Sequence, residues 1–519
     1  MSLPSIALHT HHNASVAVYY KNDILCVIEF ERFLNKKNAS GDFFEPSHSK
    51  DFVLQQIYLY LKDKYGFTQY DKFIMGHGYP EMPDKNKQAI PAYEYIIDES
   101  HHPAHAYGSF TQSPFQHALI ISFDGGSNDG LFNLYIGERG KDLVNVENFG
   151  IDLGSHYHVI GSVCEDVKKY HVLTAAGKIL GLQSYGKVRE EWKAPLKKFF
   201  TSGVPYWYNL DIKKTTLSNE IGIPFSDTNK LKGTDAYDFA RTAQEVFEEV
   251  FFETVDILVK QYNLPIVLTG GCALNIVLNT KVKERYNLPV FVAPNSTDCG
   301  LSVGLLCKYF KPTHTIDVTY KGVDVLDKFT LMEHVEKRNG RLVELSAIAQ
   351  DLSHGKILGV VQGSAEHGPR ALGNRSIICS PIPKNMKDTL NLKVKHREWY
   401  RPFAPIVRLD DVNKYFHWEG ESRWMNFCPH VREEYKDKLP AITHVDGTAR
   451  VQTVTKQQNP FMYDLLTAFE EITGIGVLVN TSFNVDGSPI LSTYKDALKV
   501  FDTTELDRVY LDGYYFVKH

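Results

Sequence analysis

The sequence contains no long apolar run, no closely spaced cysteine pair and no low-complexity tract. A membrane-spanning helix needs roughly 20 apolar residues in a row, so the sequence does not predict a membrane protein. Its seven cysteines include no C-x-x-C pair, which favours free thiols in a reducing compartment over a disulfide framework. The net charge of −5 argues against a general surface for polyanions but allows a local basic groove.

The rest of the composition is that of a globular protein. Hydrophobic residues make up 43% and charged residues 23% of the chain, as in ordinary folded domains. A chain of 519 residues is too long for one hydrophobic core, so we expect at least two domains. No signal-peptide layout precedes the strand pattern at 5–9, which predicts a cytoplasmic location.

Two strand–turn–strand units predict a duplicated lobe in the N-terminal part. The first unit has strands at 14–20 and 24–30, and the second has strands at 118–123 and 131–136. A later helix, 235–262, carries apolar residues at helical spacing and is expected to be core. A strand at 264–268, a Gly-Gly turn and a helix from Cys272 follow, and the N-terminus of this helix would attract phosphate.

A polar, charged stretch between residues 311 and 344 predicts a domain boundary. We therefore expect one domain at 1–335 and a second at 336–519. In the second domain, residues 358–361 predict a strand that leads into an arginine-containing loop. The final strand-like segment, 508–518, is expected to pack back on the first domain.

Two histidines and two aspartates predict a metal site in the first domain. His101 and His105 are four residues apart, so a helix would place both imidazoles on one face. Asp124 and Asp298 each follow a strand-like apolar run. This mixed nitrogen and oxygen set suits iron, zinc or manganese, and iron is our first choice. The alternatives for the histidines are a helix cap or hydrogen bonds within the core.

The stretch Glu366–Ser376, EHGPRALGNRS, predicts an anion-binding loop. Arg370 and Arg375 supply planar forks of donors that suit phosphate and carbonyl oxygens. Its glycines allow backbone N–H groups to approach a ligand closely. The alternative is a structural loop with solvated arginines.

Two further patterns lie in the second domain. Lys395 and Arg397 form a K-x-R pattern, and Ser482 and Asn484 form an S-x-N pattern. The cations would neutralise phosphates, and the Ser and Asn side chains would bond a transferred carbonyl group. On the residues alone, surface charge and a turn remain the alternative.

Short motifs run along nearly the whole chain. In order they are His12-Asn13-Ala14-Ser15, Glu31-Arg32-Phe33, 101–105, Asp124-Gly125-Gly126, Gly177-Lys178, Gly181-Leu182, 270–275, Asp298, 368–376, 395–398, 401–405, 446–452 and 480–484. This series resembles the O-carbamoyltransferase family, which includes the nodulation-factor, cephamycin and tobramycin carbamoyltransferases. The chain departs from the family pattern at Asn13, at Ser127-Asn128 and at Gln183-Ser184. These departures leave the acceptor undetermined.

The resemblance implies an α/β fold with two parts. The N-terminal part is expected to be an actin/hexokinase-like domain of duplicated lobes, and the C-terminal α/β domain to resemble threonylcarbamoyl-AMP synthase. The implied enzyme is an ATP-dependent O-carbamoyltransferase that moves a carbamoyl group from carbamoyl phosphate, through a carbamoyl-adenylate, to an acceptor hydroxyl. Mg-ATP and carbamoyl phosphate are the expected co-substrates, beside one divalent metal ion in the N-terminal domain.

The resemblance also assigns residues to sites. The metal ligands are His101, His105, Asp124 and Asp298. The nucleotide site of the transfer domain comprises Gly125, Gly126, Lys178, Gly270, Gly271 and Asn275. The activation site comprises Arg370, Asn374, Arg375, Lys395, Arg397, Arg450, Ser482 and Asn484. His12 is the expected general base, because a neutral imidazole can accept a proton; its rival role is a hydrogen bond to the intermediate.

One stretch bears on the acceptor. Lysines at 197–198 and 213–214 interleave with aromatic residues at 199–200 and 206–208, a pattern that suits a phosphate backbone with stacked bases. An enzyme that modifies a base in a duplex must extract it. The acceptor would then be the hydroxymethyl group of a modified cytosine in DNA. The alternatives are an aromatic cluster packed over the domain or a sugar platform, and we favour a small-molecule or sugar hydroxyl.

Two other functional classes remain as alternatives. A threonylcarbamoyl-tRNA-type enzyme with fused domains is disfavoured by the domain order and by the HGPRALG loop. A non-catalytic nucleotide sensor is disfavoured by the complete set of His, Asp, Arg and Lys side chains. The sequence does not predict an oligomeric state.

Overall fold

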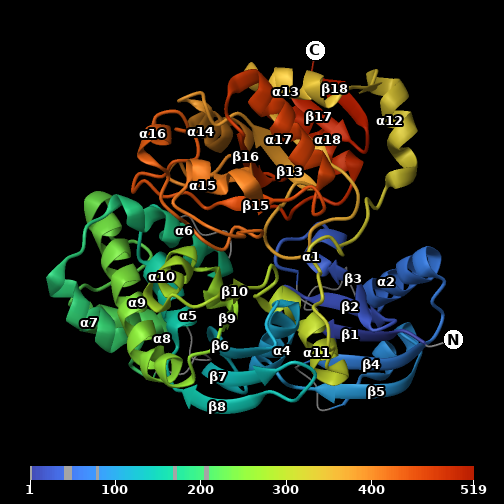
Figure 1. Ribbon diagram of the computed structural model, residues 1–519. Helices are drawn as coiled ribbons and strands as arrows, with labels where there is room; N and C mark the ends of the chain where they lie inside the picture. Colours follow the sequence, from blue (N-terminus) through green and yellow to red (C-terminus); the bar gives the residue numbers. More distant parts are fainter. Residues whose placement is uncertain (1–2, 40–49, 77–80, 168–171, 204–209, 519) are drawn as a thin grey trace.

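The computed structural model describes residues 3–39, 50–76, 81–167, 172–203 and 210–518. Within these residues it contains two five-stranded sheets and one eight-stranded sheet. Figure 1 shows the two smaller sheets in the lower half of the molecule and the C-terminal sheet above them. In the same residues, no helix combines the length and apolar character needed to cross a membrane.

The first lobe is built on a sheet with the order β3-β2-β1-β4-β5. Its strands are β1 (Ser5–His9), β2 (Ser15–Tyr20), β3 (Asp23–Glu29), β4 (Tyr70–Gly76) and β5 (Ala92–Asp98). Strands β1, β2 and β3 form an antiparallel meander, and β4 and β5 run parallel to β1. The meander confirms the first predicted strand–turn–strand unit.

The second lobe repeats this arrangement with the order β8-β7-β6-β9-β10. Its strands are β6 (His117–Ser127), β7 (Gly130–Glu138), β8 (Val144–Phe149), β9 (Ile266–Thr269) and β10 (Val290–Val292). Again the first three are antiparallel and the last two run parallel to the first. The repeat confirms the duplicated lobe and fits an actin/hexokinase-like domain.

The third sheet has the order β11-β18-β17-β12-β13-β16-β14-β15. Its strands are β11 (Arg341–Leu342), β12 (Leu358–Val361), β13 (Arg375–Cys379), β14 (Ala404–Arg408), β15 (Gln452–Val454), β16 (Val477–Ser482), β17 (Arg508–Leu511) and β18 (Tyr514–Val517). The prediction that 508–518 packs on the first domain is wrong. β17 pairs with β12 and β18 within this sheet, because their backbone groups complete its ladder.

Helices cover the three sheets. They are α1 (Phe30–Phe33), α2 (Lys50–Tyr65), α3 (Asp84–Ala89), α4 (His102–Gln112), α5 (Leu153–Ser162), α6 (Ala175–Leu182), α7 (Glu190–Phe200), α8 (Leu210–Ile221), α9 (Gly233–Tyr262), α10 (Ile276–Tyr286), α11 (Leu301–Phe310), α12 (Leu331–Arg338), α13 (Leu345–Ser353), α14 (Met386–Thr389), α15 (Val412–Tyr415), α16 (Glu433–Lys436), α17 (Pro460–Thr473) and α18 (Tyr494–Thr503). Phe239, Val246 and Phe247 of α9 are buried, which confirms it as a core helix.

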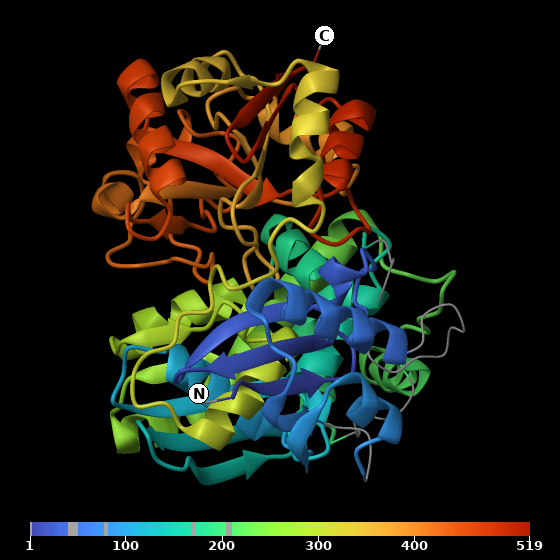
Figure 2. The same cartoon turned by 90° about the vertical axis from the view of Figure 1, so that its right-hand side faces the viewer.

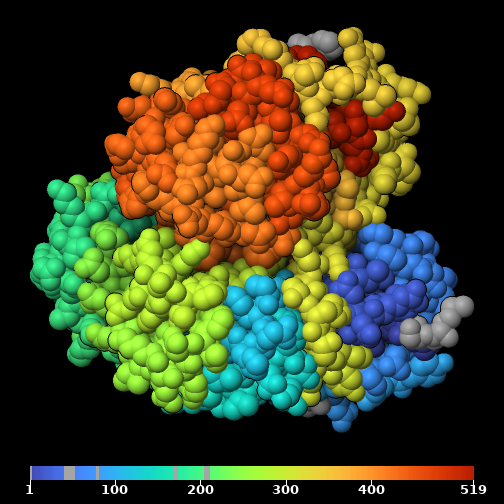
Figure 3. All heavy atoms as spheres, viewed as in Figure 1, coloured from blue at the N-terminus to red at the C-terminus, as the bar shows by residue number. Residues whose placement is uncertain are grey.

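The C-terminal residues sit directly on the lobes. Figure 2 shows them above the lobes from a second side, and Figure 3 shows their atoms in contact with the second lobe. At this interface a side chain at Gly181 of α6 would meet Pro402 at 3.5 Å and Tyr400 at 3.7 Å. The close approach places α6 against the segment that follows the K-x-R pattern.

Candidate functional site

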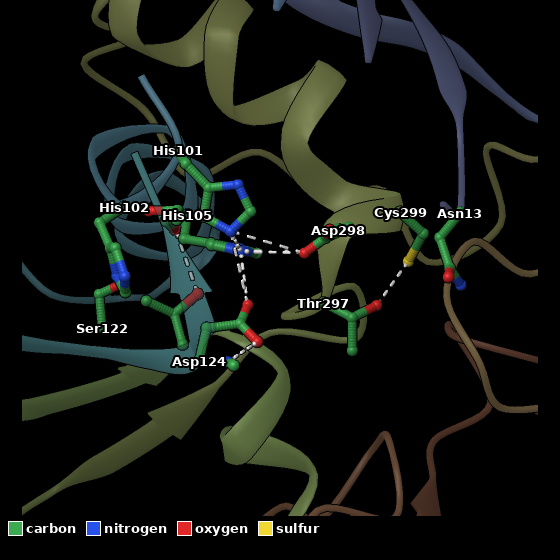
Figure 4. Close-up of polar contacts among 12 residues, drawn as sticks. Asn13, His101, His102, His105, Ser122, Asp124, Thr297, Asp298 and Cys299 are labelled. Carbon is green, nitrogen blue, oxygen red and sulfur yellow. Dashed lines mark hydrogen bonds and ion pairs between the residues drawn. The ribbon is translucent and has the colours of Figure 1, made fainter. Parts of the chain in front are cut away.

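Two histidines and two aspartates converge where α4, β6 and α11 meet. His101 immediately precedes α4 and His105 lies in its first turn, whereas Asp124 belongs to β6 and Asp298 begins the 3₁₀ turn before α11. One ligand atom from each residue lies within 4.8 Å of the other three. Figure 4 shows the four side chains directed toward one centre. We call these four residues the metal cluster.

Two carboxylates face the imidazoles of the metal cluster at short distance. The His105 Nε2 atom lies 3.1 Å from an Asp124 oxygen and 3.4 Å from an Asp298 oxygen, and it is 3.2 Å from the His101 Nε2 atom. Burial would lower the pKa of His105, but the two carboxylates raise it to about 9. A divalent ion can replace that bound proton, and the donor set fits a transition metal.

Close helix packing brings the ligands of the metal cluster together. A Cβ atom on Gly304 of α11 would lie 2.0 Å from an α4 carbonyl oxygen, and one on Gly108 of α4 would lie 3.1 Å from the Gly304 Cα. Only glycine permits this approach. The Asp129 carboxylate accepts hydrogen bonds from the backbone N–H groups of His101 and His102, at 2.7 and 3.1 Å. It therefore fixes the start of α4 and complements the helix dipole.

His12 lies beside the metal cluster. Its Nε2 atom is 3.4 Å from the second oxygen of Asp298, and its side chain is 47% exposed, so it is open to solvent. Its Nδ1 atom lies 3.3 Å from the amide oxygen of Asn13. His9 lies 3.9 Å from the same Asp298 oxygen and is buried, and this burial lowers its pKa to about 3. Sequence reasoning missed His9 because it lies within an ordinary strand pattern.

Glycines allow two segments to approach Asp124 and its neighbours closely. Gly270 has a φ of +89°, and its Cβ would lie 2.2 Å from the Phe123 carbonyl oxygen. A Cβ on Gly271 would lie 2.8 Å from an Asp124 oxygen, and one on Gly154, at the start of α5, would lie 2.6 Å from the Gly125 nitrogen. Gly125, Gly126, Gly270 and Gly271 thus belong to the surroundings of the metal cluster.

Lys178 and Asn275 make protein contacts instead of facing an open nucleotide site. The Lys178 Nζ atom lies 2.8 Å from the Glu398 carboxylate of the C-terminal domain, and both side chains are 3% exposed. Asn275 caps α10 by accepting from the Leu278 N–H and bonds Gln244. The predicted start of this helix at Cys272 is wrong. Gly271–Leu274 forms a 3₁₀ turn, and α10 begins only at Ile276.

Five cations gather in the C-terminal domain. These residues, the cation cluster, are Arg370, Lys395, Arg397, Arg401 and Arg450. Burial and the neighbouring Arg401 lower the pKa of Arg370 to about 10. The pKa of Arg397 and that of Arg450 also fall well below the usual range, through burial and through repulsion from other members. Like charges held together with partial burial are costly unless an anion joins them.

The donors of the cation cluster are incompletely used. The Nε atoms of Arg370 and Arg450 are buried and have no hydrogen-bond partner within the described part of the chain. Arg401 lies 3.6 Å from the Glu398 carboxylate and 3.8 Å from Asp486. The geometry therefore suits a polyanion such as a nucleoside triphosphate or an acyl phosphate. Sequence reasoning did not assign Arg401 to the site, although the Arg-Pro-Phe motif that contains it was visible.

Side chains of the K-x-R and S-x-N patterns are in direct contact. The Lys395 ammonium donates to the Asn484 side-chain oxygen at 2.6 Å, to its backbone oxygen at 2.7 Å and to the Ser482 hydroxyl at 3.2 Å. Arg397 donates to Asn391 at 2.7 Å, and its guanidinium lies over the Phe403 ring. The surface-charge alternative is wrong for this pair, because Lys395 is buried and Arg397 is partly buried.

Two sequence-family patterns match the chain. The pattern described as "Carbamoyltransferase N-terminus" matches residues 44–307, and the one described as "Carbamoyltransferase C-terminus" matches residues 349–518. The chain belongs to the carbamoyltransferase family. It is therefore a transferase, and the match covers both the metal cluster and the cation cluster.

Similar proteins are consistent with this family assignment. The nodulation protein NolNO of Sinorhizobium fredii is 32% identical over 98% of this chain and 79% of its own length. The 3'-hydroxymethylcephem-O-carbamoyltransferase of Amycolatopsis lactamdurans is 35% identical over 49% of this chain and 50% of its own length. The solved T. kodakarensis HypF structure is 14% identical, covers 60% of this chain and 49% of that chain, and has a TM-score of 0.37. Because this TM-score is low, the fold assignment rests on the strand orders described above and not on this structure.

Two predicted anion ligands of the carbamoyltransferase have structural roles. Arg375 is fully buried, and its guanidinium donates to the carbonyl oxygens of Gln362, Gly363 and Asn374 at 2.7–3.0 Å. Asn374 donates to the Ser364 carbonyl at 2.8 Å. The assignment of Arg375 to phosphate is wrong, because its fork is occupied by the backbone that leads into the loop.

The lysine and aromatic stretch does not form the predicted nucleic-acid platform in the residues described. Phe199 and Phe200 are buried in the core. Lys213 is 1% exposed and pairs with Asp152 at 2.7 Å. The aromatic residues at 206–208 lie outside the described residues. The pattern misled because alternating charge and aromatic character also arises where a helix covers a core.

Proposed function

We propose that this carbamoyltransferase uses ATP to activate the carbamoyl group of carbamoyl phosphate and transfers it to an acceptor hydroxyl. The observation that carries the proposal is the pairing of two different sites in one chain. The cation cluster suits phosphates, whereas the metal cluster with His12 suits transfer to an alcohol. The division at 1–335 and 336–519 assigns transfer to the first part and activation to the second, and the likeness of the second to threonylcarbamoyl-AMP synthase belongs to the same proposal.

Activation takes place at the cation cluster. Carbamoyl phosphate reacts with water to give carbamate and phosphate. A carbamate oxygen then attacks the α-phosphorus of ATP, and pyrophosphate leaves with its Mg²⁺, so that a carbamoyl-adenylate forms. Arg370, Arg397 and Arg450 stabilise the charge on the phosphates. Lys395 holds Ser482 and Asn484 in place to bond the carbamoyl oxygen and nitrogen.

Transfer takes place beside the metal cluster. The acceptor hydroxyl attacks the carbamoyl carbon, and AMP leaves as its phosphate oxygen takes the bond electrons. His12 accepts the hydroxyl proton, which its exposed position next to Asp298 supports. His101, His105, Asp124 and Asp298 would hold one divalent ion, with iron preferred over zinc or manganese. Such an ion supplies Lewis-acid stabilisation of negative charge.

The acceptor class that we propose is a small-molecule or sugar hydroxyl. A relative whose name specifies a hydroxymethyl acceptor supports this choice. Hydroxymethylated DNA is the second candidate, and it has less support because Phe199, Phe200 and Lys213 of its proposed platform are buried.

The test is a reaction with α-labelled ATP, carbamoyl phosphate and a panel of alcohols. The panel contains a hydroxymethylcephem, aminoglycosides, simple sugars and hydroxymethylated DNA, and mass spectrometry identifies the carbamoylated product. We expect AMP and pyrophosphate only when carbamoyl phosphate is present. Turnover that requires threonine and tRNA instead would identify a threonylcarbamoyl-tRNA-type enzyme. No turnover under any condition would favour a nucleotide sensor and refute the proposal.

A further inference from the structure

The loop at 366–376, here the anion loop, is held by residues of the first lobe. Arg32 of α1 donates to the carbonyl oxygens of Glu366 and Gly368. Glu29, at the end of β3, accepts from the Gly368 N–H at 2.9 Å and contacts the His367 Nδ1 atom at 3.1 Å. All these side chains are at most 7% exposed. We call Glu29 and Arg32 the clasp.

Arg370 lies along the chain between the residues held by the clasp and those held by a second set of hydrogen bonds within the loop, which we call the brace. The Glu366 carboxylate accepts hydrogen bonds from the backbone N–H groups of Leu372, Asn374 and Arg375, at 2.6, 2.8 and 3.2 Å. Arg370 therefore lies two residues after the clasped Gly368 and two residues before the braced Leu372. The brace gives the anion loop its internal shape, whereas the clasp sets its position relative to the first lobe.

Gly368 of the anion loop also touches the segment that carries a metal ligand. Gly368 has a φ of +112°, and a Cβ there would lie 2.3 Å from the Pro294 carbonyl oxygen and 3.5 Å from the Asn295 Cα. Asp298 follows three residues after Asn295 in the same segment. The loop that carries Arg370 is thus in direct contact with the segment that carries Asp298.

Glu29 of the clasp also pairs with the strand that follows His12. Glu29 pairs with Ser15 in the β2–β3 ladder, and His12 lies in the turn just before β2. The Ser15 hydroxyl lies 2.7 Å from the Ser302 hydroxyl of α11. The buried contacts of Ser15 and Glu29 therefore connect the turn that carries His12 with α11 and with the anion loop.

We propose that Glu29 and Arg32 are positioning residues that align the activation site with the transfer site, so that the carbamoyl-adenylate is handed over and not released. This inference rests on the proposed function. Arg32 suits the role because its planar fork bridges two carbonyl oxygens, which a lysine ammonium cannot do with the same geometry. A loss of this alignment leaves the brace intact, so activation persists while the intermediate escapes and is hydrolysed to AMP and carbamate.

The experiment compares Arg32→Lys with wild type and measures two products in one reaction, pyrophosphate and carbamoylated acceptor. We expect the ratio of acceptor product to pyrophosphate to fall by about ten- to a hundredfold, the scale expected for a displacement of about 1 Å at a reacting centre. Glu29→Gln should lower the same ratio and serves if Arg32→Lys does not fold. A purely structural role would lower both products in parallel and leave the ratio unchanged, which would overturn the inference.

Arg139→Lys is the matched control. Arg139 is also a buried arginine, and it donates to backbone carbonyl oxygens of Thr111, Ser113 and Phe115, at the end of α4 and in the segment that follows it. Its variant should retain the wild-type ratio, and a comparable fall there would also count against the clasp. A wild-type protein that forms no pyrophosphate from ATP and carbamoyl phosphate would refute the proposed function itself, which separates the two failures.

Discussion

At the scale of single residues, the cation cluster suits anion binding but lowers the stability of the ligand-free protein. Arg370, Arg397 and Arg450 each repel other members and lose hydration, so the ligand-free protein carries an unfavourable charge arrangement. An anion removes this penalty when it binds. The free energy of binding therefore includes the relief of repulsion, and single arginines should be dispensable for folding but not for substrate binding.

Replacing Arg450 by Met should stabilise the ligand-free protein by about 1–4 kcal/mol, because a partly buried, repelled charge becomes an apolar contact. The same variant should lose the stabilisation by ATP, which for one site reaches about 2.7 kcal/mol at a hundred times Kd. Thermal unfolding with and without ATP measures both effects. Arg338→Met, at an ion pair with Asp502, is the control and should change neither. A less stable Arg450→Met variant with full ATP protection would contradict the assignment.

Replacing His105 by Ala should remove the bound metal and stop transfer, while pyrophosphate formation continues at the cation cluster. Metal content of the purified proteins and product analysis provide the two measurements. His117→Ala, at a histidine that is 58% exposed, should retain the wild-type metal content. If His105→Ala kept one metal ion per chain, the metal cluster would not be the binding site.

At the scale of elements, local patterns predicted what local interactions build. The HxxxH spacing predicted one helical face, and the His105 N–H bond to the His101 carbonyl, at 2.9 Å, is that helical turn. The meanders were predictable because strand alternation and polar turns are also local. Contacts between distant segments could not be predicted from the spacing of residues along the chain. Arg32 and Glu366, for example, are 334 residues apart. Arg375 was misassigned for the same reason, since its partners are set by how the loop folds back.

The α4–α11 crossing is the element that assembles the metal cluster, so Gly304→Ala tests it directly. The added Cβ would lie 2.0 Å from the Ala104 carbonyl oxygen, and relieving that overlap must move one helix away from the other. We expect a loss of unfolding free energy of about 1–3 kcal/mol together with weaker metal binding. Gly177→Ala in α6, with open space around it, should be neutral or stabilising. Unchanged metal affinity in Gly304→Ala would show that the crossing does not position the ligands.

At the scale of the whole molecule, buried charges bind the C-terminal domain to the lobes. The Lys178–Glu398 pair joins α6 to the residue that follows Arg397. On the other side, the clasp joins the first lobe to the anion loop. Because removal of one partner leaves a buried charge uncompensated, substitution of a single partner at either contact should weaken domain association strongly.

The clasp should make this association sensitive to acid. Burial by itself would raise the pKa of Glu29, but Arg32, His367 and the Gly368 N–H lower it from 4.5 to about 2. A carboxyl with a lowered pKa stabilises the folded state fully above about pH 4.5, and this contribution is lost as the pH falls toward 2. The difference in unfolding free energy between wild type and Glu29→Gln should therefore shrink by about 3 kcal/mol over that range. Urea unfolding between pH 6 and pH 2.5 measures it, and a constant difference would contradict the assignment.

The repeated strand order has a consequence for the symmetry of the metal cluster. Helix α4 follows the last strand of one lobe and α11 follows the last strand of the other, and they cross at a glycine from each. A symmetric pair of identical halves would present every ligand twice across this crossing. The present halves contribute unequally, with two imidazoles from the start of α4 and one carboxylate from the turn before α11, so the metal cluster is asymmetric although the strand order around it is repeated.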